Sequence, residues 1–186
     1  MTTTPYELIR SRRKTISLEV RDGRAIVRAP LRESKRRIDA FVSAHEEWLR
    51  DKLQKSADAA SLAESEGTLS EAEINALMDN ALEYIPLRTK AIAEELGVTY
   101  GKITIGCYKT KWGSCSPNGN LSFNCLLMLT PLEVIDSIVV HELCHRKEMN
   151  HSKRFYDAVY AARPDYDRSH KWLRDNGDVL MRRAWR

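Results

Sequence analysis

The stretch TPLEVIDSIVVHELCHRKEMNH, residues 130–151, constrains the fold more than any other part of the chain. Its first half is apolar, and its second half contains three of the five histidines. Thr130 as the N-cap, Pro131 at the first helical position and Glu133 completing a capping box predict a helix over residues 131–149. Because the first half of this helix is so apolar, we expect it to be buried against a small twisted sheet.

The histidines of this helix are spaced for binding one metal ion. Residues four apart lie on one face of a helix, about 6 Å apart along its axis. His141 and His145 can therefore both direct a ring nitrogen at one zinc ion. Glu142 is rotated by about 100° from His141, so it flanks the metal. There it can act as the general base that takes a proton from a zinc-bound water. The competing interpretation is a polar helix face whose histidines are simply solvated.

His151 can be the third ligand only if the helix stops and the chain turns back. A continuing helix would place it about 240° away from the ligand face. Asn150, directly before it, tolerates the left-handed conformation. Metzincins share the one, five, eleven histidine spacing but have glycine at the eighth position, where this chain has Glu148. The turn must therefore be built differently here. The alternative third ligands lie downstream: Asp157, Asp165 and His170.

The N-terminal part of the sequence predicts a β-hairpin followed by a helix. Residues 15–30 alternate apolar and polar side chains around Asp22-Gly23, a pair that readily forms a tight turn. Helical spacing of apolar residues predicts a helix over residues 34–53, with its first residue, a serine, as the N-cap. The small and polar stretch 56–69 is expected to be a linker or a frayed connection.

The central part of the chain alternates between helix and strand signals. A helical pattern over residues 70–96 ends at Gly97, and Pro86 should kink this helix or divide it into two. Residues 103–108 and 120–128 are predicted as strands. The segment between them contains Pro-Asn-Gly and is predicted as a turn.

Two further helices are predicted at residues 152–163 and 165–176, stopped by Pro164 and Gly177. Strands followed by helices with short connections indicate an α+β fold. We expect a small, mostly antiparallel sheet that packs on the histidine-bearing helix. The further C-terminal helices, and an N-terminal hairpin plus helix, complete this expected fold.

The charge of the chain is uneven, although its net value is only +4. Residues 1–37 carry eleven Lys or Arg against four Asp or Glu, a net charge of +7. We therefore divide the chain into a basic N-terminal region, residues 1–66, and a catalytic region, residues 67–186. The basic patch could bind nucleic acid or another polyanion weakly. The simpler interpretation is a solvated hairpin face.

The composition is that of a soluble globular protein, with 42% hydrophobic and 30% charged residues. No apolar segment near the start resembles a secretory signal, and no apolar run could span a membrane, so we expect a cytoplasmic protein. The four cysteines have irregular spacing, and reduced thiols are expected. Cys144 is interpreted as a small buried residue. A second metal site formed by Cys107, Cys115 and Cys125 is the alternative.

Several motifs of the sequence occur together in one known family: WGSC at 112–115, HELCH at 141–145, NHS at 150–152 with Phe155, and PDYDRSHKWLRDNG at 164–177. Through them the chain resembles the YgjP-like family of zinc metallopeptidases, which is related to the WLM and SprT-like domains. The similarity is dense over residues 109–177. One departure is Tyr156, which stands where many relatives have Trp.

The resemblance implies a zincin-type fold with His141, His145 and His151 as zinc ligands and Glu142 as the general base. It leaves the substrate open, because a nucleoside triphosphate pyrophosphatase activity has also been attached to a relative. The residues expected to bind substrate are Lys111, Trp112, Gly113 and Ser114. Trp112 can equally be a core residue and Gly113 a β-bulge.

An edge strand could bind an extended substrate through backbone hydrogen bonds, and residues 120–126 or 111–116 could provide that strand. The candidates for stabilising an oxyanion are Lys109, Lys111, Tyr156, Tyr160 and Tyr166. The sequence is therefore most consistent with a zinc hydrolase that cleaves peptide bonds. The first alternative is a metal-dependent nucleoside triphosphate pyrophosphohydrolase, although no Walker-type loop is present. The second is a nucleic-acid-associated zinc domain, and copper, nickel or iron would also suit an imidazole site.

Overall fold

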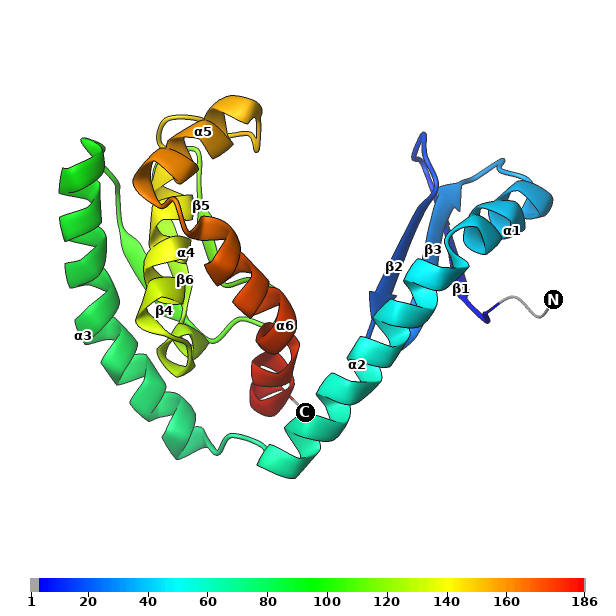
Figure 1. Ribbon diagram of the computed structural model, residues 1–186, viewed down its shortest axis with the longest axis horizontal. Coiled ribbons are helices and arrows are strands. Elements are labelled where there is room, and N and C mark those ends of the chain that lie inside the picture. Colours follow the sequence, from blue (N-terminus) through cyan, green and yellow to red (C-terminus); the bar gives the residue numbers. More distant parts are fainter. Residues whose placement is uncertain (1–3, 186) are drawn as a thin grey trace. The chain divides into compact units, whose positions relative to one another are not determined.

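The computed structural model describes residues 4–185, which form two compact units that divide between Ser65 and Glu66. Each unit has its own three-stranded sheet and its own hydrophobic core (Figure 1). The chain is therefore a mixed α+β protein with two small sheets. None of the helices within residues 4–185 is both long enough and apolar enough to cross a membrane.

The N-terminal unit places a three-stranded sheet beside two helices. Its elements are β1 (Glu7–Ser11), β2 (Ser17–Arg21), β3 (Arg24–Pro30), α1 (Lys35–Ala44) and α2 (Glu46–Glu66). The strand order is β1-β3-β2, with β1 parallel and β2 antiparallel to the central strand β3. Alternate residues of β3 (Ala25, Val27 and Ala29) are buried and form one core with Ile38, Val42 and Leu49 of the helices.

The predicted hairpin is confirmed, because β2 and β3 pair on either side of Asp22-Gly23. Both turn residues have positive φ, 51° at Asp22 and 72° at Gly23, as a two-residue turn between twisted strands requires. Strand β1 was not predicted. It is short, and its partner β3 lies far along the sequence, so no local pattern indicates the pairing.

The predicted helix over residues 34–53 is present as two helices, because α1 ends at Ala44 and α2 begins at Glu46. Its predicted N-cap is confirmed, since the Ser34 hydroxyl accepts a hydrogen bond from the Arg37 N–H at 3.2 Å. The predicted linker over 56–69 is wrong, because α2 continues to Glu66. Alanine and glutamate are strong helix formers, and this propensity outweighs the weak apolar pattern of the stretch.

The C-terminal unit contains a second three-stranded sheet and most of the helices. Its elements are α3 (Glu71–Leu96), β4 (Ile103–Gly106), β5 (Gly113–Cys115), β6 (Leu121–Asn124), the 3-10 helix η1 (Cys125–Leu129), α4 (Leu132–Cys144), α5 (Lys153–Ala162) and α6 (Tyr166–Ala184). The strand order is β4-β6-β5, with β4 parallel and β5 antiparallel to β6. The sheet is thus mixed, and the prediction of a mostly antiparallel sheet is wrong.

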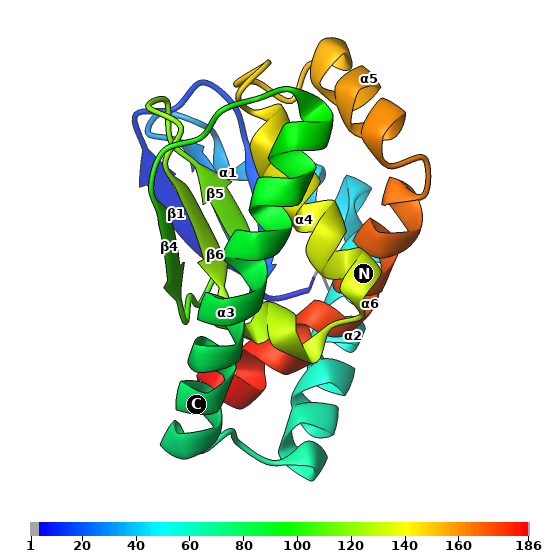
Figure 2. The same ribbon diagram turned by 90° about the vertical axis from the view of Figure 1, so that its left-hand side faces the viewer.

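Helix α4 lies at the centre of this unit. It packs against α3, α5, α6 and strand β5, and α3 runs beside it (Figure 2). Its apolar side chains Val139, Val140 and Leu143 are almost fully buried in one core with Leu121 and Phe123 of β6. The expected packing of this helix against a small sheet is therefore confirmed.

The ends of α4 differ from the prediction. Pro131 is the N-cap, without a side-chain hydrogen bond, and the Thr130 hydroxyl instead donates to the Leu127 carbonyl at 2.8 Å. The predicted capping box is therefore absent from this helix. The helix also ends at Cys144, five residues earlier than predicted.

Helix α3 has the predicted boundaries, but it lacks the predicted interruption at Pro86. Ser70 and Glu73 form a reciprocal capping box, and Gly97 ends the helix with φ 64°. The helix continues through Pro86 without interruption, so the division into two helices is wrong. Pro86 removes only one backbone donor, and the neighbouring Ile85 is fully buried, so packing holds the helix together.

The remaining elements correct several local predictions. Strand β6 ends at Asn124 and gives way to η1, and the predicted turn before it contains the short strand β5. Helix α5 ends before Pro164 as predicted, but α6 runs through Gly177 to Ala184. A Cβ at Gly177 would lie 3.0 Å from the Trp112 ring. This glycine therefore allows close packing of α6 and does not end the helix.

Candidate metal centre

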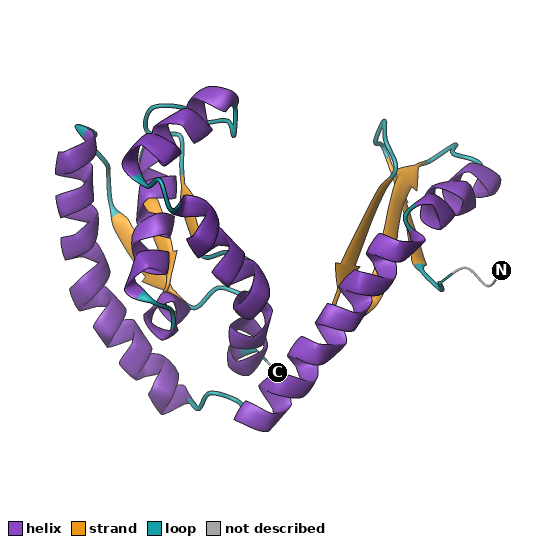
Figure 3. Cartoon of the chain, in the orientation of Figure 1, coloured by secondary structure: helices purple, strands orange, loops and turns teal. Residues whose placement is uncertain are grey.

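The three predicted ligand histidines lie together in the C-terminal unit. Their ring nitrogens that could bind a metal are all within 4.8 Å of one another. His141 lies in the last turn of α4, His145 caps that helix, and His151 is in the loop that joins α4 to α5. Figure 3 distinguishes the helices of the chain from the loops that join them by colour. The Nε2 atoms of His141 and His151 are 3.1 Å apart.

The early end of α4 brings His151 back to the helix. After Cys144 the chain turns, and the N–H groups of Lys147 and Glu148 both donate to the Cys144 carbonyl, at 2.9 and 3.0 Å. Within residues 4–185, Asp22 is the only residue other than glycine with a positive φ, so the turn does not use a left-handed Asn150. The condition set for His151, that the helix stops and the chain returns, is met by an ordinary right-handed turn.

Hydrogen bonds fix the ring orientation of two of the histidines. Nδ1 of His141 is 2.9 Å from the Tyr166 hydroxyl, and Nδ1 of His145 is 3.2 Å from the Glu148 carbonyl. A carbonyl only accepts, so His145 Nδ1 carries the proton and Nε2 keeps its lone pair. Such a partner on the second ring nitrogen is typical of histidines that bind metal through the first.

The buried ring of Phe155 contacts all three histidines of the cluster. Phe155 of α5 is fully buried, and its ring centroid lies 4.9, 4.5 and 4.8 Å from those of His141, His145 and His151. Its ring therefore packs against all three imidazoles. Nothing in the local sequence pattern singles out this residue except its place in the family motif.

The residues present fit a metal ion with three nitrogen ligands. Burial, together with the neighbouring histidines, lowers the pKa of His141 to about 4, and burial lowers the pKa of His145. Both rings are therefore neutral and have a lone pair to donate. Zinc–nitrogen bonds of 2.0–2.1 Å place the ligand nitrogens of a tetrahedral site about 3.3 Å apart. The spacing of the three nitrogens is compatible with such a site.

The alternative third ligands do not join the cluster. Asp157 pairs with Lys153 at 2.8 Å, and the His170 ring stacks on Tyr166 with centroids 5.7 Å apart. Asp165 is the N-cap of α6. Within residues 4–185, the group of His141, His145 and His151 is the one cluster of at least three His, Cys, Asp or Glu side chains that could hold a metal. The alternative site of Cys107, Cys115 and Cys125 is therefore not formed.

The cysteines have no chemical role at this site. Cys144 is almost fully buried as predicted, and burial raises its pKa to about 11. Burial beside Cys107 raises the pKa of Cys125 to about 12. Both thiols stay protonated at neutral pH, which makes them poor metal ligands.

Glu142 is buried beside strand β5. Its side chain is 5% exposed, and burial raises its pKa to about 7, with Lys111 acting in the opposite direction. A Cβ at Gly113 would lie 2.7 Å from Glu142 Oε1 and 2.8 Å from its Cγ. The close approach that glycine permits here is therefore to the Glu142 side chain.

Of the predicted substrate-binding residues, Gly113 and Ser114 lie in β5, which is an edge strand of its sheet, and the other two directly precede it. Lys111 Nζ donates to the Ser114 hydroxyl at 2.8 Å and lies over the Tyr108 ring. Trp112 is partly buried and packs on the core. The prediction that residues 120–126 form an edge is wrong, because β6 is the central strand.

The oxyanion candidates are separated by their contacts. The Tyr166 hydroxyl is hydrogen-bonded to His141, and the Tyr160 hydroxyl donates to Asp167 at 2.8 Å. Lys109 lies over the ring of Trp185. The Tyr156 ring is 37% exposed, with its centroid 6.2 Å from that of His151. The partnership of Tyr166 with His141 was missed, because no sequence spacing connects residues that far apart.

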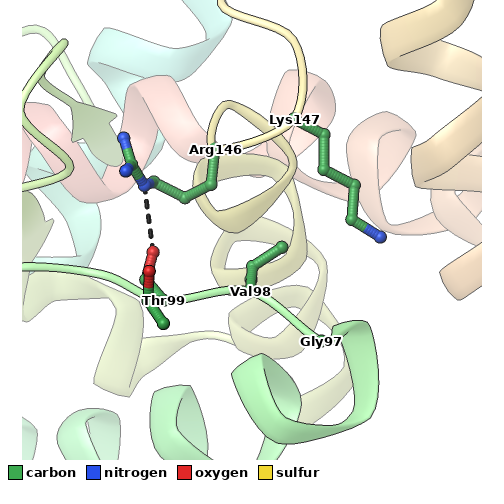
Figure 4. A pocket seen from close by; sticks show the side chains of 5 residues that line it. All are labelled: Gly97, Val98, Thr99, Arg146 and Lys147. Carbon is green, nitrogen blue, oxygen red and sulfur yellow. Dashed lines mark hydrogen bonds between the residues drawn. The ribbon is translucent and has the colours of Figure 1, made fainter.

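A separate pocket of about 300 Å³ lies between the loop after α3 and the end of α4 (Figure 4). It is lined by Gly97, Val98, Thr99, Arg146 and Lys147. Arg146 Nε donates to the Thr99 carbonyl at 3.0 Å, which ties the loop after α3 to the end of α4. None of the three histidines and no part of Glu142 lines this pocket.

The comparison with protein families agrees with the sequence motifs. Residues 14–76 and 59–176 match the YgjP-like, metallopeptidase domain family. Among solved structures, the metallopeptidase zymogen jannalysin of Methanocaldococcus jannaschii is 22% identical, with a TM-score of 0.43 over 49% of this chain and 94% of its own. The zymogen abylysin of Pyrococcus abyssi is also 22% identical, with a TM-score of 0.42 over 50% of this chain and 97% of its own.

A comparison with curated proteins finds no match. The two family matches together extend from residue 14 to residue 176, well over half of the chain. They include the three histidines and Glu142. The resemblance inferred from the motifs is thereby confirmed, and the chain belongs to the YgjP-like metallopeptidase domain family.

Proposed function

We propose that the chain is a zinc-dependent peptidase whose metal ion is held by His141, His145 and His151. The observation that carries this proposal is the meeting of three imidazoles, two of them partnered at Nδ1, around one point. Glu142, next in sequence to the first of them, is buried against an edge strand. Membership of a metallopeptidase family supports the same reaction class.

The ligand set favours zinc, because three neutral nitrogens with a remaining open position are typical of catalytic zinc sites. When bound, the ion would polarise a substrate carbonyl and lower the pKa of a water molecule beside it. The domain needs no metal for its core, which Phe123, Leu127 and their neighbours already fill. A catalytic role is therefore favoured over a structural one.

Glu142 is assigned the proton transfers. One of its carboxylate oxygens takes a proton from the attacking water, and the same carboxyl then gives it to the leaving amine nitrogen. A group that must both accept and release a proton works best with a pKa near the working pH. Burial places the pKa of Glu142 at about 7, which meets that requirement.

Strand β5 is assigned the binding of an extended peptide. It is an edge strand, so one side of its backbone is open to pairing with a further strand. The contact of Gly113 with Glu142 would hold the bound backbone next to the general base. Lys111 is hydrogen-bonded to Ser114, so it is less suited to gripping phosphates, and a peptide is favoured over a nucleoside triphosphate.

The test compares wild type with His151→Ala and Glu142→Gln. Zinc content is measured by elemental mass spectrometry, and cleavage of a mixed peptide library is measured by peptide mass spectrometry. We expect about one zinc per chain in wild type and Glu142→Gln, weakened binding in His151→Ala, and peptide cleavage in wild type alone. Loss of Glu142 should lower the rate by about 10²- to 10⁴-fold.

Two results would contradict the proposal. Zinc bound equally by His151→Ala and wild type would exclude the three-histidine site. Release of pyrophosphate from nucleoside triphosphates, abolished in Glu142→Gln, without any peptide cleavage would assign the same site to phosphoanhydride hydrolysis.

A further inference from the structure

The net charge of the chain resides entirely in its N-terminal unit. Residues 1–65 contain fourteen Lys or Arg and ten Asp or Glu, whereas residues 66–186 contain sixteen of each. Within the N-terminal unit the first 37 residues carry a net charge of +7, so the remainder, residues 38–65, carries −3. This unit is therefore strongly polarised along its sequence.

The sheet topology gathers the basic residues at one end. Strands β1 and β2 flank β3, so the connection between them, residues 12–16, has to cross the end of β3. The connection from β3 to α1, residues 31–34, starts at that same end, because β1 is parallel to β3. The two connections and the start of α1 therefore lie close together.

Hydrogen bonds of Arg10 confirm this closeness. Its Nη1 donates to the carbonyls of Pro30, Leu31 and Glu33, at 3.1, 3.1 and 2.8 Å. These bonds join the end of β1 to the connection before α1. We name residues 10–14 and 31–37 the basic end of the N-terminal unit.

The basic end contains eight cations and a single acid. The cations are Arg10, Arg12, Arg13, Lys14, Arg32, Lys35, Arg36 and Arg37, and the acid is Glu33. Lys35 pairs with Asp39, and Arg37 pairs with Glu33. Among residues 4–185, Arg12, Lys14, Arg32 and Arg36 form no ion pair, and all four are exposed. Four cations of this end thus face solvent without a counter-charge.

We propose that the basic end binds the phosphodiester backbone of a nucleic acid. Six of its eight cations are arginines. The planar guanidinium group donates two hydrogen bonds at once to a phosphate and is the preferred cation for nucleic-acid contacts. The β1–β2 connection and the β3–α1 connection offer their cations from two adjacent segments, which suits the repeated charges of a backbone. Binding would be independent of base sequence.

An anionic membrane is the less suitable partner. Apolar side chains beside the cations strengthen binding to a membrane surface. Within residues 10–37, Leu31 is the one exposed large apolar residue, at 56% exposure. Arg36 and Arg37 on α1 are followed by the buried Ile38, so this helix offers no exposed apolar face at its start.

The test uses the full chain and fluorescently labelled duplexes of about 20 base pairs, one of DNA and one of RNA, with binding followed by anisotropy. The test variant replaces Arg12, Arg32 and Arg36 with Gln. The matched control replaces three exposed cations of the C-terminal unit, Lys90, Lys102 and Arg168, with Gln, so both variants lose the same charge. Vesicles of phosphatidylcholine with phosphatidylserine form the third arm.

Wild type and the control are expected to bind a duplex with a Kd on the order of micromolar at about 50 mM salt. The test variant should bind at least about tenfold more weakly, and the slope of log K against log salt should decrease by about 2 to 3. The DNA and RNA arms decide which backbone is bound. Equal weakening in both variants, absence of binding by wild type, or binding to the vesicles alone would overturn the proposal. None of these outcomes depends on peptidase activity.

Discussion

The two units of the chain differ in whether their ionisable side chains are buried or exposed. The C-terminal unit buries ionisable side chains, among them Asp136, Glu142 and His145, each 8% exposed or less. In the described part of the N-terminal unit, the buried polar residue is the uncharged Ser56. Its many arginines and lysines remain at the surface.

This difference separates two kinds of function. Burial of an ionisable group costs free energy and shifts its pKa, and it is maintained where chemistry or a structural network needs it. Exposed charges act together over longer distances and suit binding. The comparison therefore assigns chemistry to the C-terminal unit and binding to the N-terminal unit. The following experiments would break or sharpen that assignment.

The largest expected effect is the loss of stability of the C-terminal unit in Asp136→Asn. Asp136 of α4 accepts two hydrogen bonds from Arg88 of α3, at 2.6 and 2.7 Å, and a further one from Arg163 after α5. Removal of its charge leaves two partly buried arginines without a partner and should destabilise the unit by about 2–4 kcal/mol. Hydrogen exchange measured by mass spectrometry would report this loss in the peptides of α3, α4 and α5.

Asp39→Asn is the matched control from the N-terminal unit. Asp39 pairs with Lys35 at 2.5 Å, but both side chains are well exposed, at 41% and 63%. Exchange in this unit should not change measurably, because exposed pairs contribute little. Equal loss in both variants would show that the two units do not differ in how their charges act.

The second effect concerns the contact between Gly113 and Glu142. In Gly113→Ala the new methyl group would meet Glu142 Cγ at 2.8 Å, so the carboxyl has to move. A small displacement of a catalytic group can lower the rate by about 10²-fold. We expect that loss in kcat/KM for peptide cleavage while zinc stays bound. Ser114→Ala, the neighbouring control, should change the rate much less, and a similar loss in both would contradict the role of Gly113.

The histidine cluster could be predicted from the sequence because its members lie within eleven residues of one another. Helical spacing places His141 and His145 on one face, and the third histidine has a short path back. The same holds for other features that were predicted from residues close together in the sequence. These are the helix caps at Ser34 and Ser70 and the turn at Asp22-Gly23. These local signals succeeded because the residues that form the contact also define the pattern, although the equally local capping box predicted at Thr130 and Glu133 is absent.

Several of the errors came from contacts between distant residues. Gly177 carries the local signal of a helix end, but it packs against Trp112 and α6 continues. Strand β1 is short and depends on β3, which follows only after β2. The contact of Tyr166 with His141 belongs to the same class, because it forms only once α6 packs on α4.

The third prediction is a lower zinc affinity in Tyr166→Phe, which tests the contact between Tyr166 and His141. The variant keeps the buried ring and removes the hydroxyl that lies 2.9 Å from His141 Nδ1. Loss of such a partner lowers metal affinity by about 10- to 100-fold, and we expect the lower part of that range because His145 keeps its partner. Competition with a chelating dye measures the zinc affinity directly. Tyr160→Phe, which loses a hydroxyl bonded to Asp167, is the control and should leave the affinity unchanged.

The smallest expected effect is the loss of stability of the N-terminal hairpin in Gly23→Ala. Gly23 has φ 72°, a conformation that costs a residue with a Cβ about 1 kcal/mol. Hydrogen exchange should become faster in residues 17–30, which form the hairpin, and zinc affinity should not change. Asp22→Gly is the matched variant, because Asp22 already has φ 51° and glycine would relax it. Faster exchange in Asp22→Gly as large as that in Gly23→Ala would contradict the left-handed turn. A change of zinc affinity in Gly23→Ala would instead show that the hairpin supports the metal centre, and the separation of binding from chemistry would fail.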